Sequence, residues 1–569
     1  MTAILTEAPP SARVEPYRLS PEARRVFVGL MLGMLVASIS QTIVGPAMPR
    51  IVAELGGMDH YSWVATAAML VSAITVPVVG KLSDLYGRRG FYLAGLVVFM
   101  VGSVVSGLAG SFWVLVLGRA IQGLGMGTLM PLSQTIIGDI IPARQRGKYQ
   151  GLMGAVFGVT SVAGPLAGGF ITDHWGWRWL FFAAVPIGLA ATVVIARFLH
   201  LPHQRREARI DYAGIATLTV ALVSLLLATS LGGTSYPWGS PTILALYAVG
   251  VVALVAFVLV ERRAEEPVIP LRLFRSSVFT ASNVAGFAVS MVMFGSIIYI
   301  PVYAQGVLGV DATNSGLILM PLMLGLIVMG ILSGLVITRT GSYKAIMVTG
   351  VVVMGAGLWL LTRLGWASSQ ADLTVAMVVL GVGLGMAMQQ YTLVVQNAVD
   401  RTDLGVATAS TQFFRNVGST VGIAVFGTVM TSGLATAIAS HLPPAVAARV
   451  PAGTADAGSV LDPSALAGLP AVVADAVRQG LADQLHEVFL VALPLVLVVL
   501  VATIAIRPLP LRETAHADAP LSEEVGHEVL DAMAQSSPEG ARDDAEPAVT
   551  ASGGSASEGG HRDRRHVGG

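Results

Sequence analysis

Fourteen apolar runs divide this chain, and each is long enough to cross the roughly 30 Å hydrocarbon core of a bilayer as a helix. The first begins near residue 26, and the last covers residues 488–507. Of the 569 residues, 54% are hydrophobic and 12% are charged, whereas soluble domains are usually about a quarter charged. Backbone polar groups in lipid must be satisfied within the protein, which favours helices. The runs therefore predict an all-α membrane protein with fourteen spans.

The lysines and arginines test this count independently, because loops that stay in the cytoplasm collect basic residues. With a cytoplasmic N-terminus, the N-terminal segment and the inside loops hold 21 of the 34 basic residues, and the outside loops hold five. A missed span would invert this alternation partway along the chain, and it never inverts. We therefore expect a multi-pass protein of the cell inner (plasma) membrane with both termini in the cytoplasm.

The spans fall into two similar halves. Gly123–Gly127 in the fourth span corresponds to Gly381–Gly385 in the twelfth, and both strings lie inside apolar helices, which indicates close helix packing rather than dinucleotide binding. A further helix is expected around Ala471–Glu487, on the membrane surface or over the outer mouth. The expected parts are a cytoplasmic N-terminal segment (1–25), a six-helix bundle (26–199), basic loops with two extra spans (200–277), a second six-helix bundle (278–507) with an extracellular loop (432–487), and a disordered acidic cytoplasmic tail (508–569).

A short basic loop joins the second and third spans, with the sequence Gly80-Lys81-Leu82-Ser83-Asp84-Leu85-Tyr86-Gly87-Arg88-Arg89. Gly87 permits a sharp turn with positive φ, and Asp84 is placed to hold a nearby arginine or a helix N-terminus. The loop resembles the signature loop after the second span of major facilitator superfamily transporters; the alternative is an ordinary basic loop. The resemblance implies a conformational switch formed by Gly80, Asp84, Gly87, Arg88 and Arg89.

Three further stretches resemble motifs of the same superfamily. Leu117–Gly125 looks like its fourth-span motif, in which an arginine precedes a glycine-lined face. Thr42-Ile43-Val44, leading to Pro49, resembles the first-span motif of its fourteen-span drug:proton antiporter family, which includes multidrug efflux proteins. Gly164-Pro165-Leu166-Ala167-Gly168-Gly169 resembles the antiporter motif, and implies a hinge formed by Gly164, Pro165, Gly168 and Gly169. The resemblance implies the major facilitator fold, with fourteen helices in two six-helix bundles plus two inserted helices.

Charged residues within the spans are few, and their positions bear on the transport pathway. The first-span motif of that family usually carries an aspartate where this chain has Ser40, and no acid lies at mid-depth in any expected span. Arg119 and Arg415 are the only charges well inside spans, where a charge is costly unless it faces a cavity or a partner. We expect the pathway to be formed by Arg119, Gln122, Gln41 and Arg415. Two arginines without a carboxylate favour neutral or anionic amphiphiles.

These features predict a secondary active transporter that exports amphipathic small molecules by alternating access, coupled to proton influx. A lipid or glycolipid exporter of the same fold is the alternative, and an uptake symporter is disfavoured by the antiporter motif. We expect no enzyme activity, no catalytic residue, no cofactor and no metal, since acidic and histidine clusters are lacking and the chain has no cysteine. The expected partners are a small amphipathic substrate, protons and the lipid bilayer, with no nucleic acid, and the chain is expected to be a monomer.

Overall fold

The computed structural model describes residues 20–56, 60, 63–200, 210–233, 236–310, 318–442 and 470–512. Within these residues, fourteen helical segments are long and apolar enough to cross a membrane. The only extended pairing in the described part is an isolated bridge between Gly232 and Tyr236. The predicted all-α fold with fourteen spans is thus confirmed.

The first group of helices comprises α1 (Pro21–Thr42), the 3-10 turn η1 (Gly45–Ala47), α2 (Met48–Leu55), α3 (Trp63–Tyr86), α4 (Arg88–Gly107), α5 (Phe112–Ile140), α6 (Ala143–His174), α7 (Arg178–Phe182) and α8 (Ala184–Phe198). The inserted pair comprises α9 (Tyr212–Leu231) and α10 (Pro241–Glu261). The second group comprises η3 (Leu271–Arg275), α11 (Ser277–Gly306), α13 (Met320–Thr340), α14 (Lys344–Thr362), α15 (Gln370–Asn397), η5 (Arg401–Asp403), α16 (Leu404–His441) and α20 (Ala471–Ala505).

Polar residues fix several of the helix starts. The hydroxyl of Ser20 accepts a hydrogen bond from the backbone N–H of Ala23 at 3.1 Å, directly before Pro21 opens α1. The Asp211 carboxylate accepts from the N–H of Gly214 at 2.7 Å and so caps α9. These bonds satisfy N–H groups that the first helical turn leaves without partners, and the chain therefore enters each span at a defined residue.

The glycine strings pack the helices closely, as predicted. A β-carbon on Gly123 would lie 2.5 Å from the Ala68 carbonyl of α3, and one on Gly125 would lie 2.5 Å from Phe99 of α4. In the second half, Gly381 and Gly383 of α15 press in the same way against α13 and α14. The first string thus packs α5 between α3 and α4, and the second packs α15 between α13 and α14. This correspondence agrees with the repeat seen in the sequence.

The structure differs from the expected loop 432–487 at both of its ends. Helix α16 continues to His441, and α20 begins at Ala471, so the expected separate helix Ala471–Glu487 is the first part of the last span. Residues 481–493 contain no glycine or proline, so the helix continues unbroken from Glu487 into Val488. The two extensions pack together, and the His441 ring bonds the Asp483 carboxylate at 2.7 Å. The rest of this loop, residues 443–469, lies outside the described residues.

The expected tail also begins with an ordered stretch. Residues 508–512 follow α20 and are described, whereas residues 513–569 and 1–19 lie outside the described part. The Asn397 side-chain amide donates to the Pro510 carbonyl at 3.0 Å, and the backbone N–H of Arg144 donates to the Arg512 carbonyl at 3.1 Å. This stretch therefore bonds both α15 of the second half and α6 of the first.

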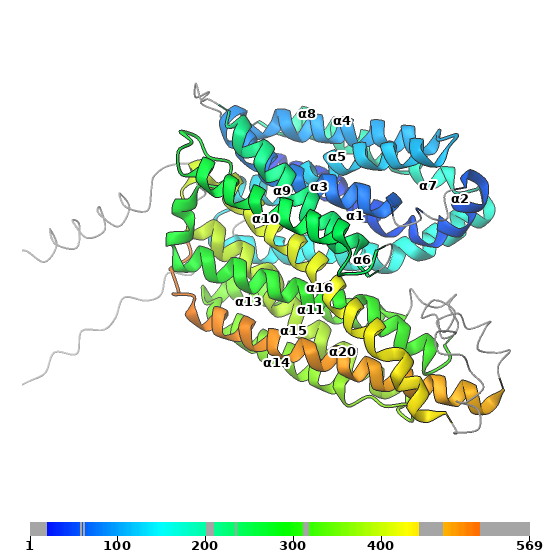
Figure 1. The fold of residues 1–569 in the computed structure, drawn as a ribbon. Helices are drawn as coiled ribbons and strands as arrows, with labels where there is room; N and C mark the ends of the chain where they lie inside the picture. The colour runs from blue at the N-terminus through cyan, green and yellow to red at the C-terminus, as the bar shows by residue number, and fades with distance from the viewer. Residues whose placement is uncertain are drawn as a thin grey trace, which may run out of the picture. The chain divides into compact units, whose positions relative to one another are not determined.

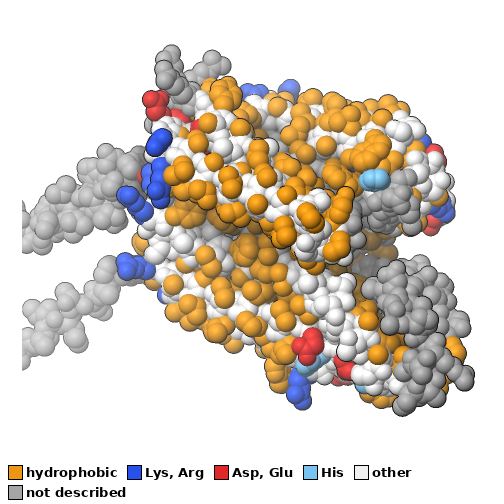
Figure 2. All heavy atoms as spheres, in the orientation of Figure 1, with side chains coloured by type: hydrophobic (Ala, Val, Ile, Leu, Met, Phe, Trp, Pro, Cys, Tyr) orange, Lys and Arg blue, Asp and Glu red, His pale blue; other side chains and the backbone are white. Residues whose placement is uncertain are grey.

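Figure 1 shows the two groups of helices side by side, with α1 to α8 in one and α11 to α20 in the other. Helices α9 and α10 pack against each other, and α9 also contacts α3 and α16. The space-filling view in Figure 2 shows apolar side chains covering the helices, with lysine and arginine gathered at its left. We call the end where α3 meets α4 and α5 meets α6 the basic end, and the opposite end the far end. The basic residues of the basic end include Lys81, Arg88, Arg89, Arg144, Arg146 and Lys148.

Candidate functional site

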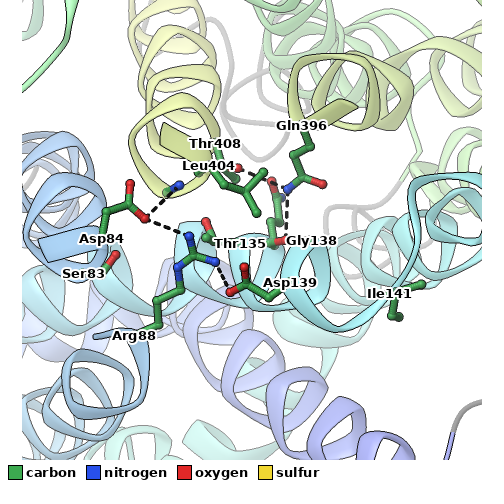
Figure 3. Close-up of polar contacts among 12 residues, drawn as sticks. Ser83, Asp84, Arg88, Thr135, Gly138, Asp139, Ile141, Gln396, Leu404 and Thr408 are labelled. Carbon is green, nitrogen blue, oxygen red and sulfur yellow. Dashed lines mark hydrogen bonds and ion pairs between the residues drawn. The ribbon is translucent and has the colours of Figure 1, made fainter. Parts of the chain in front are cut away.

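Asp84 joins the two halves at the basic end (Figure 3). Its carboxylate accepts hydrogen bonds from the backbone N–H groups of Gly405 at 3.1 Å and Val406 at 2.9 Å, in the first turn of α16. It also accepts from Arg88 at 2.8 Å, and Arg88 pairs in turn with Asp139 of α5. A carboxylate at a helix N-terminus satisfies free N–H groups and interacts favourably with the helix dipole. The structure thus places Asp84 beside both partners expected from the sequence, an arginine and a helix end.

The glycines of the same loop allow this contact. A β-carbon on Gly80 would overlap the Ala409 side chain of α16, and one on Gly405 would overlap the Asp84 carboxylate. Gly87 has φ of 98°, which an L-residue with a side chain rarely adopts, and it separates α3 from α4. Arg89 points elsewhere, and its guanidinium donates to the Ala196 carbonyl of α8 at 2.5 Å. Its role is therefore to hold α4 against α8 in this conformation.

A second close contact between the halves lies between α6 and α13. A β-carbon on Gly334 would overlap the Gly147 carbonyl, and one on Gly151 would lie 2.5 Å from the Gly330 carbonyl. The stretch from Gly334 to Lys344, with Gly341, resembles the Gly80–Arg89 loop at the corresponding place in the second half. Both copies therefore press a glycine against the opposite half. The basic end is therefore closed by two glycine contacts, α3 with α16 and α6 with α13.

The segment after α10 forms ion pairs with α3 and with the residues directly before α16, the two helices that meet at the basic end. The Lys81 ammonium pairs with Glu266 at 2.5 Å, which ties this segment to α3. Arg272 forms two parallel bonds to Asp403, at 2.7 and 2.9 Å, directly before α16. The carboxylate of Asp403 is nearly buried, whereas the Arg272 side chain is largely exposed, so solvent still screens one side of this forked pair. Sequence reasoning missed both pairs.

Two cavities lie between the halves, beyond the closed basic end. The larger has a volume of about 500 Å³ and is lined by α3, α9, α11 and α16 toward the far end. The smaller, of about 80 Å³, lies deeper and is lined by helices of both halves, including α1, α5, α11 and α15. Both cavities share four lining residues, so they are neighbouring parts of one path: Gln41, Ser72, Phe294 and Asn416.

Methionine dominates the apolar wall of the deeper cavity. Its side chain is unbranched and polarizable, and it adapts to ligands of different shape. Six methionines come together here from five helices that are far apart in sequence: Met34, Met126, Met130, Met153, Met293 and Met388. The sequence holds 22 methionines, and only the fold shows which of them share a surface. Such a wall suits ligands that have an apolar body but no fixed outline.

Arg415 is the only charged side chain that lines either cavity, among the residues described. A β-carbon on Gly286 of α11 would lie 3.5 Å from the Arg415 Cγ, so the side chain passes close to a glycine of the facing helix. Within the described chain Arg415 has no ion pair and no side-chain hydrogen bond, while its neighbours Gln412 and Asn416 bond each other at 2.9 Å. Its charge is therefore available to a ligand.

Arg119, which was also expected in the pathway, lies in a different setting. Its guanidinium donates to the Val64 carbonyl at 3.1 Å, to the Ser40 carbonyl at 3.2 Å and hydroxyl at 3.0 Å, and to Gln122 at 2.8 Å. Gln122 then donates to the Ser103 hydroxyl at 2.6 Å. Arg119 and Gln122 line neither of the two cavities, and in this conformation they bind α5 to α1, α3 and α4. Of the four predicted pathway residues, Gln41 and Arg415 face the cavities.

The antiporter-like motif packs α6 against the end of α1. β-Carbons on Gly164 and Gly168 would overlap the Thr42 hydroxyl and the Ile43 carbonyl, whereas one on Gly169 would meet no atom within 4 Å. The Thr42 hydroxyl donates to the Thr160 carbonyl at 3.0 Å, one turn before Pro165 interrupts the hydrogen bonds of α6. Gly164 and Gly168 thus pack directly against the end of α1, and Pro165 follows Gly164 within α6.

Known proteins are similar to this chain over most of its length. The profile of the Major Facilitator Superfamily matches residues 30–423. The multidrug transporter protein MdtP of Bacillus subtilis (strain 168) is 38% identical over 505 residues, which cover 85% of this chain and 93% of MdtP. Multidrug resistance protein 3 of the same organism is 36% identical over 480 residues, which cover 83% and 93%. The crystal structure of the human organic anion transporter MFSD10 has a TM-score of 0.55 at 16% identity and covers 84% of this chain and 100% of its own, which supports the fold alone.

Proposed function

Because this chain belongs to the Major Facilitator Superfamily, we propose that it is a secondary active transporter that exports amphipathic small molecules by alternating access. One observation carries the proposal: two connected cavities lie between the halves, behind a basic end that Asp84 and the glycine contacts close. The methionine wall of the deeper cavity suits substrates of varied shape. Names of the two bacterial relatives, a multidrug transporter and a multidrug resistance protein, agree with export of such compounds.

Orientation follows from the basic loops. Lysine and arginine collect on the cytoplasmic side of membrane proteins, so the basic end is the cytoplasmic end and both termini are cytoplasmic. The conformation described is then closed to the cytoplasm, with its larger cavity toward the outside. We place the protein in the inner (plasma) membrane as a monomer, divided as the sequence indicates into two six-helix bundles and an inserted pair.

Proton influx is the proposed driving force. The glycines of the antiporter-like motif press α6 against α1. A switch between two packings of these helices would couple the exchange of protons for substrate to the opening of the cavities. Lipid or glycolipid export remains the second candidate, because the described lining residues of both cavities carry no carboxylate that would select cationic drugs.

Everted membrane vesicles from cells that produce the protein test this proposal. Fluorescent amphiphiles and a fluorescent lipid are supplied outside, with the vesicle lumen made acidic. The proposal expects the small amphiphiles to accumulate inside, and a protonophore to abolish that accumulation. Accumulation of the lipid alone favours the second candidate, and no accumulation of any probe contradicts both.

A further inference from the structure

Among the residues that the structure describes, Arg415 holds the one charge that faces the adjoining cavities, and none of them neutralises it. Arg88 lies between Asp84 and Asp139, and Arg119 donates to four oxygen atoms. Arg415 has no such acceptor within the described residues, although it lies in α16 beside the methionine-lined cavity. A guanidinium stays protonated, and an unpaired charge held inside a membrane protein is costly. A ligand that brings a negative charge would remove that cost.

Together, the two cavities define the rest of such a ligand. The deeper cavity offers methionines to an apolar body, and the larger one, of about 500 Å³, is within the range of pockets that hold drug-sized molecules. The larger cavity is lined by apolar, hydroxyl and amide side chains, including Thr229 of α9 and Trp238 of the turn between α9 and α10, and the described residues there include no charge. The described lining residues therefore present one positive charge in the deeper cavity and neutral surfaces in the larger one.

From this arrangement we infer that Arg415 binds the anionic group of the substrate, so that the exported compounds are drug-sized organic anions with an apolar body. The inference rests on the proposed export function and names its substrate class. Anion and guanidinium form charge-assisted hydrogen bonds, which are roughly twice as strong as neutral ones. Cationic amphiphiles meet only repulsion at this position. A chloride ion or an anionic lipid headgroup could offer the same negative charge, and the experiment separates them from an organic anion.

Three probes that share the apolar pyrene ring and differ in charge provide the test: pyrenesulfonate, pyrenemethanol and a pyrenylmethyl-trimethylammonium salt. Binding is measured with the purified full chain in phosphatidylcholine nanodiscs and gluconate buffer, and transport is measured in proteoliposomes. Arg415→Gln removes the charge, and Arg415→Lys keeps it. The matched control is Arg363→Gln, since Arg363 is exposed and lies over the Trp359 ring, away from both cavities. Unchanged pyrenemethanol binding shows that a variant remains folded.

We expect the wild type to bind pyrenesulfonate at least about tenfold more tightly than the ammonium probe, as loss of one charged hydrogen bond implies. Arg415→Gln should abolish that preference, Arg415→Lys should keep part of it, and Arg363→Gln should keep all of it. A preference that survives in Arg415→Gln overturns the inference. So does displacement of pyrenesulfonate by chloride at physiological concentration, which assigns the site to an inorganic ion, or by phosphatidylglycerol, which assigns it to a lipid.

Transport measurements distinguish a failure of the organic-anion assignment from a failure of the export proposal on which it rests. If the neutral and ammonium probes are exported as well as pyrenesulfonate in the wild type, export stands and the organic-anion assignment is overturned. If pyrenesulfonate binds through Arg415 but none of the probes crosses the membrane, the anion site stands and the export proposal fails.

Discussion

Asp84 of α3 accepts a hydrogen bond from the backbone N–H of Val406 in α16 at 2.9 Å, and so joins the two halves of the protein. The neighbouring N–H of Gly405 donates to the same carboxylate at 3.1 Å. Both bonds depend on the first turn of α16 lying against α3, because a helix offers free N–H groups only at its start. Opening the basic end would therefore break them, and we expect this carboxylate to act in a gate rather than in the substrate site.

Asp84→Asn should slow the transport of every substrate alike. The amide lacks the negative charge, and each charged hydrogen bond that is lost costs the closed state about 1.5–3 kcal/mol. The chain has no cysteine, so Ser410→Cys, at a buried position of α16, reports opening through its reaction with a maleimide. Labelling should rise in Asp84→Asn while substrate binding is kept. Loss of transport for one substrate only would contradict a gate role.

Gly334→Ala should also weaken the closed basic end. The added methyl group would overlap the Gly147 carbonyl, and overpacking of this kind costs about 1–3 kcal/mol. Gly90→Ala is the matched control, since a β-carbon there would meet no atom within 4 Å. Maleimide labelling at the Ser410→Cys position should increase only with Gly334→Ala. Equal labelling in both variants would show that this contact does not hold the gate.

Gly168→Ala should impair transport, whereas Gly169→Ala should not. The first places a methyl group against the Ile43 carbonyl, at a cost of about 1–3 kcal/mol, and the second places it in open space. The double variant Gly164→Ala with Pro165→Ala should lose transport for the same reason and through loss of the helix interruption. Initial export rates in vesicles measure all three. Normal export by the double variant would leave the motif without a mechanistic role.

Arg119→Lys should reduce transport sharply, because one ammonium cannot replace the bonds to Val64, Ser40 and Gln122 together. Arg119→Ala should abolish transport while the protein stays folded, as size-exclusion chromatography and a lowered but cooperative melting transition would show. A fully active alanine variant would show that the bonds Arg119 makes to α1 and α3 are not needed for transport.

Much of the fold was predictable because the signals are local. Apolar length sets each span, and basic loops set the alternation. The exception is the start of the last span, where polar residues such as Arg478 and Gln484 lower the hydropathy although the helix continues. The Gln484 amide donates to the Val429 carbonyl of α16 at 2.6 Å, so these polar side chains serve contact between two helices rather than marking the end of one.

Less of the site was predictable, because its parts come from distant residues. Asp84 was expected to meet an arginine or a helix end, and it lies beside both, but its switching role remains a prediction. The pairs Lys81 with Glu266 and Arg272 with Asp403 have no sequence signature, since each joins residues more than a hundred positions apart. Arg119 and Arg415, the two charges expected well inside spans, look alike in sequence, and only the helix packing shows that Arg415 faces the cavity.

Transport by the purified protein tests the central claim most directly. Proteoliposomes that contain the full chain and a trapped pH-sensitive dye receive an amphipathic substrate on the side of the basic end. We predict that the substrate enters the vesicles only when the lumen is more acidic, that protons leave the lumen as it enters, and that Asp84→Asn slows both fluxes together. Entry of the substrate at the same rate without a pH gradient, or proton movement without substrate movement, would contradict export by proton-coupled alternating access.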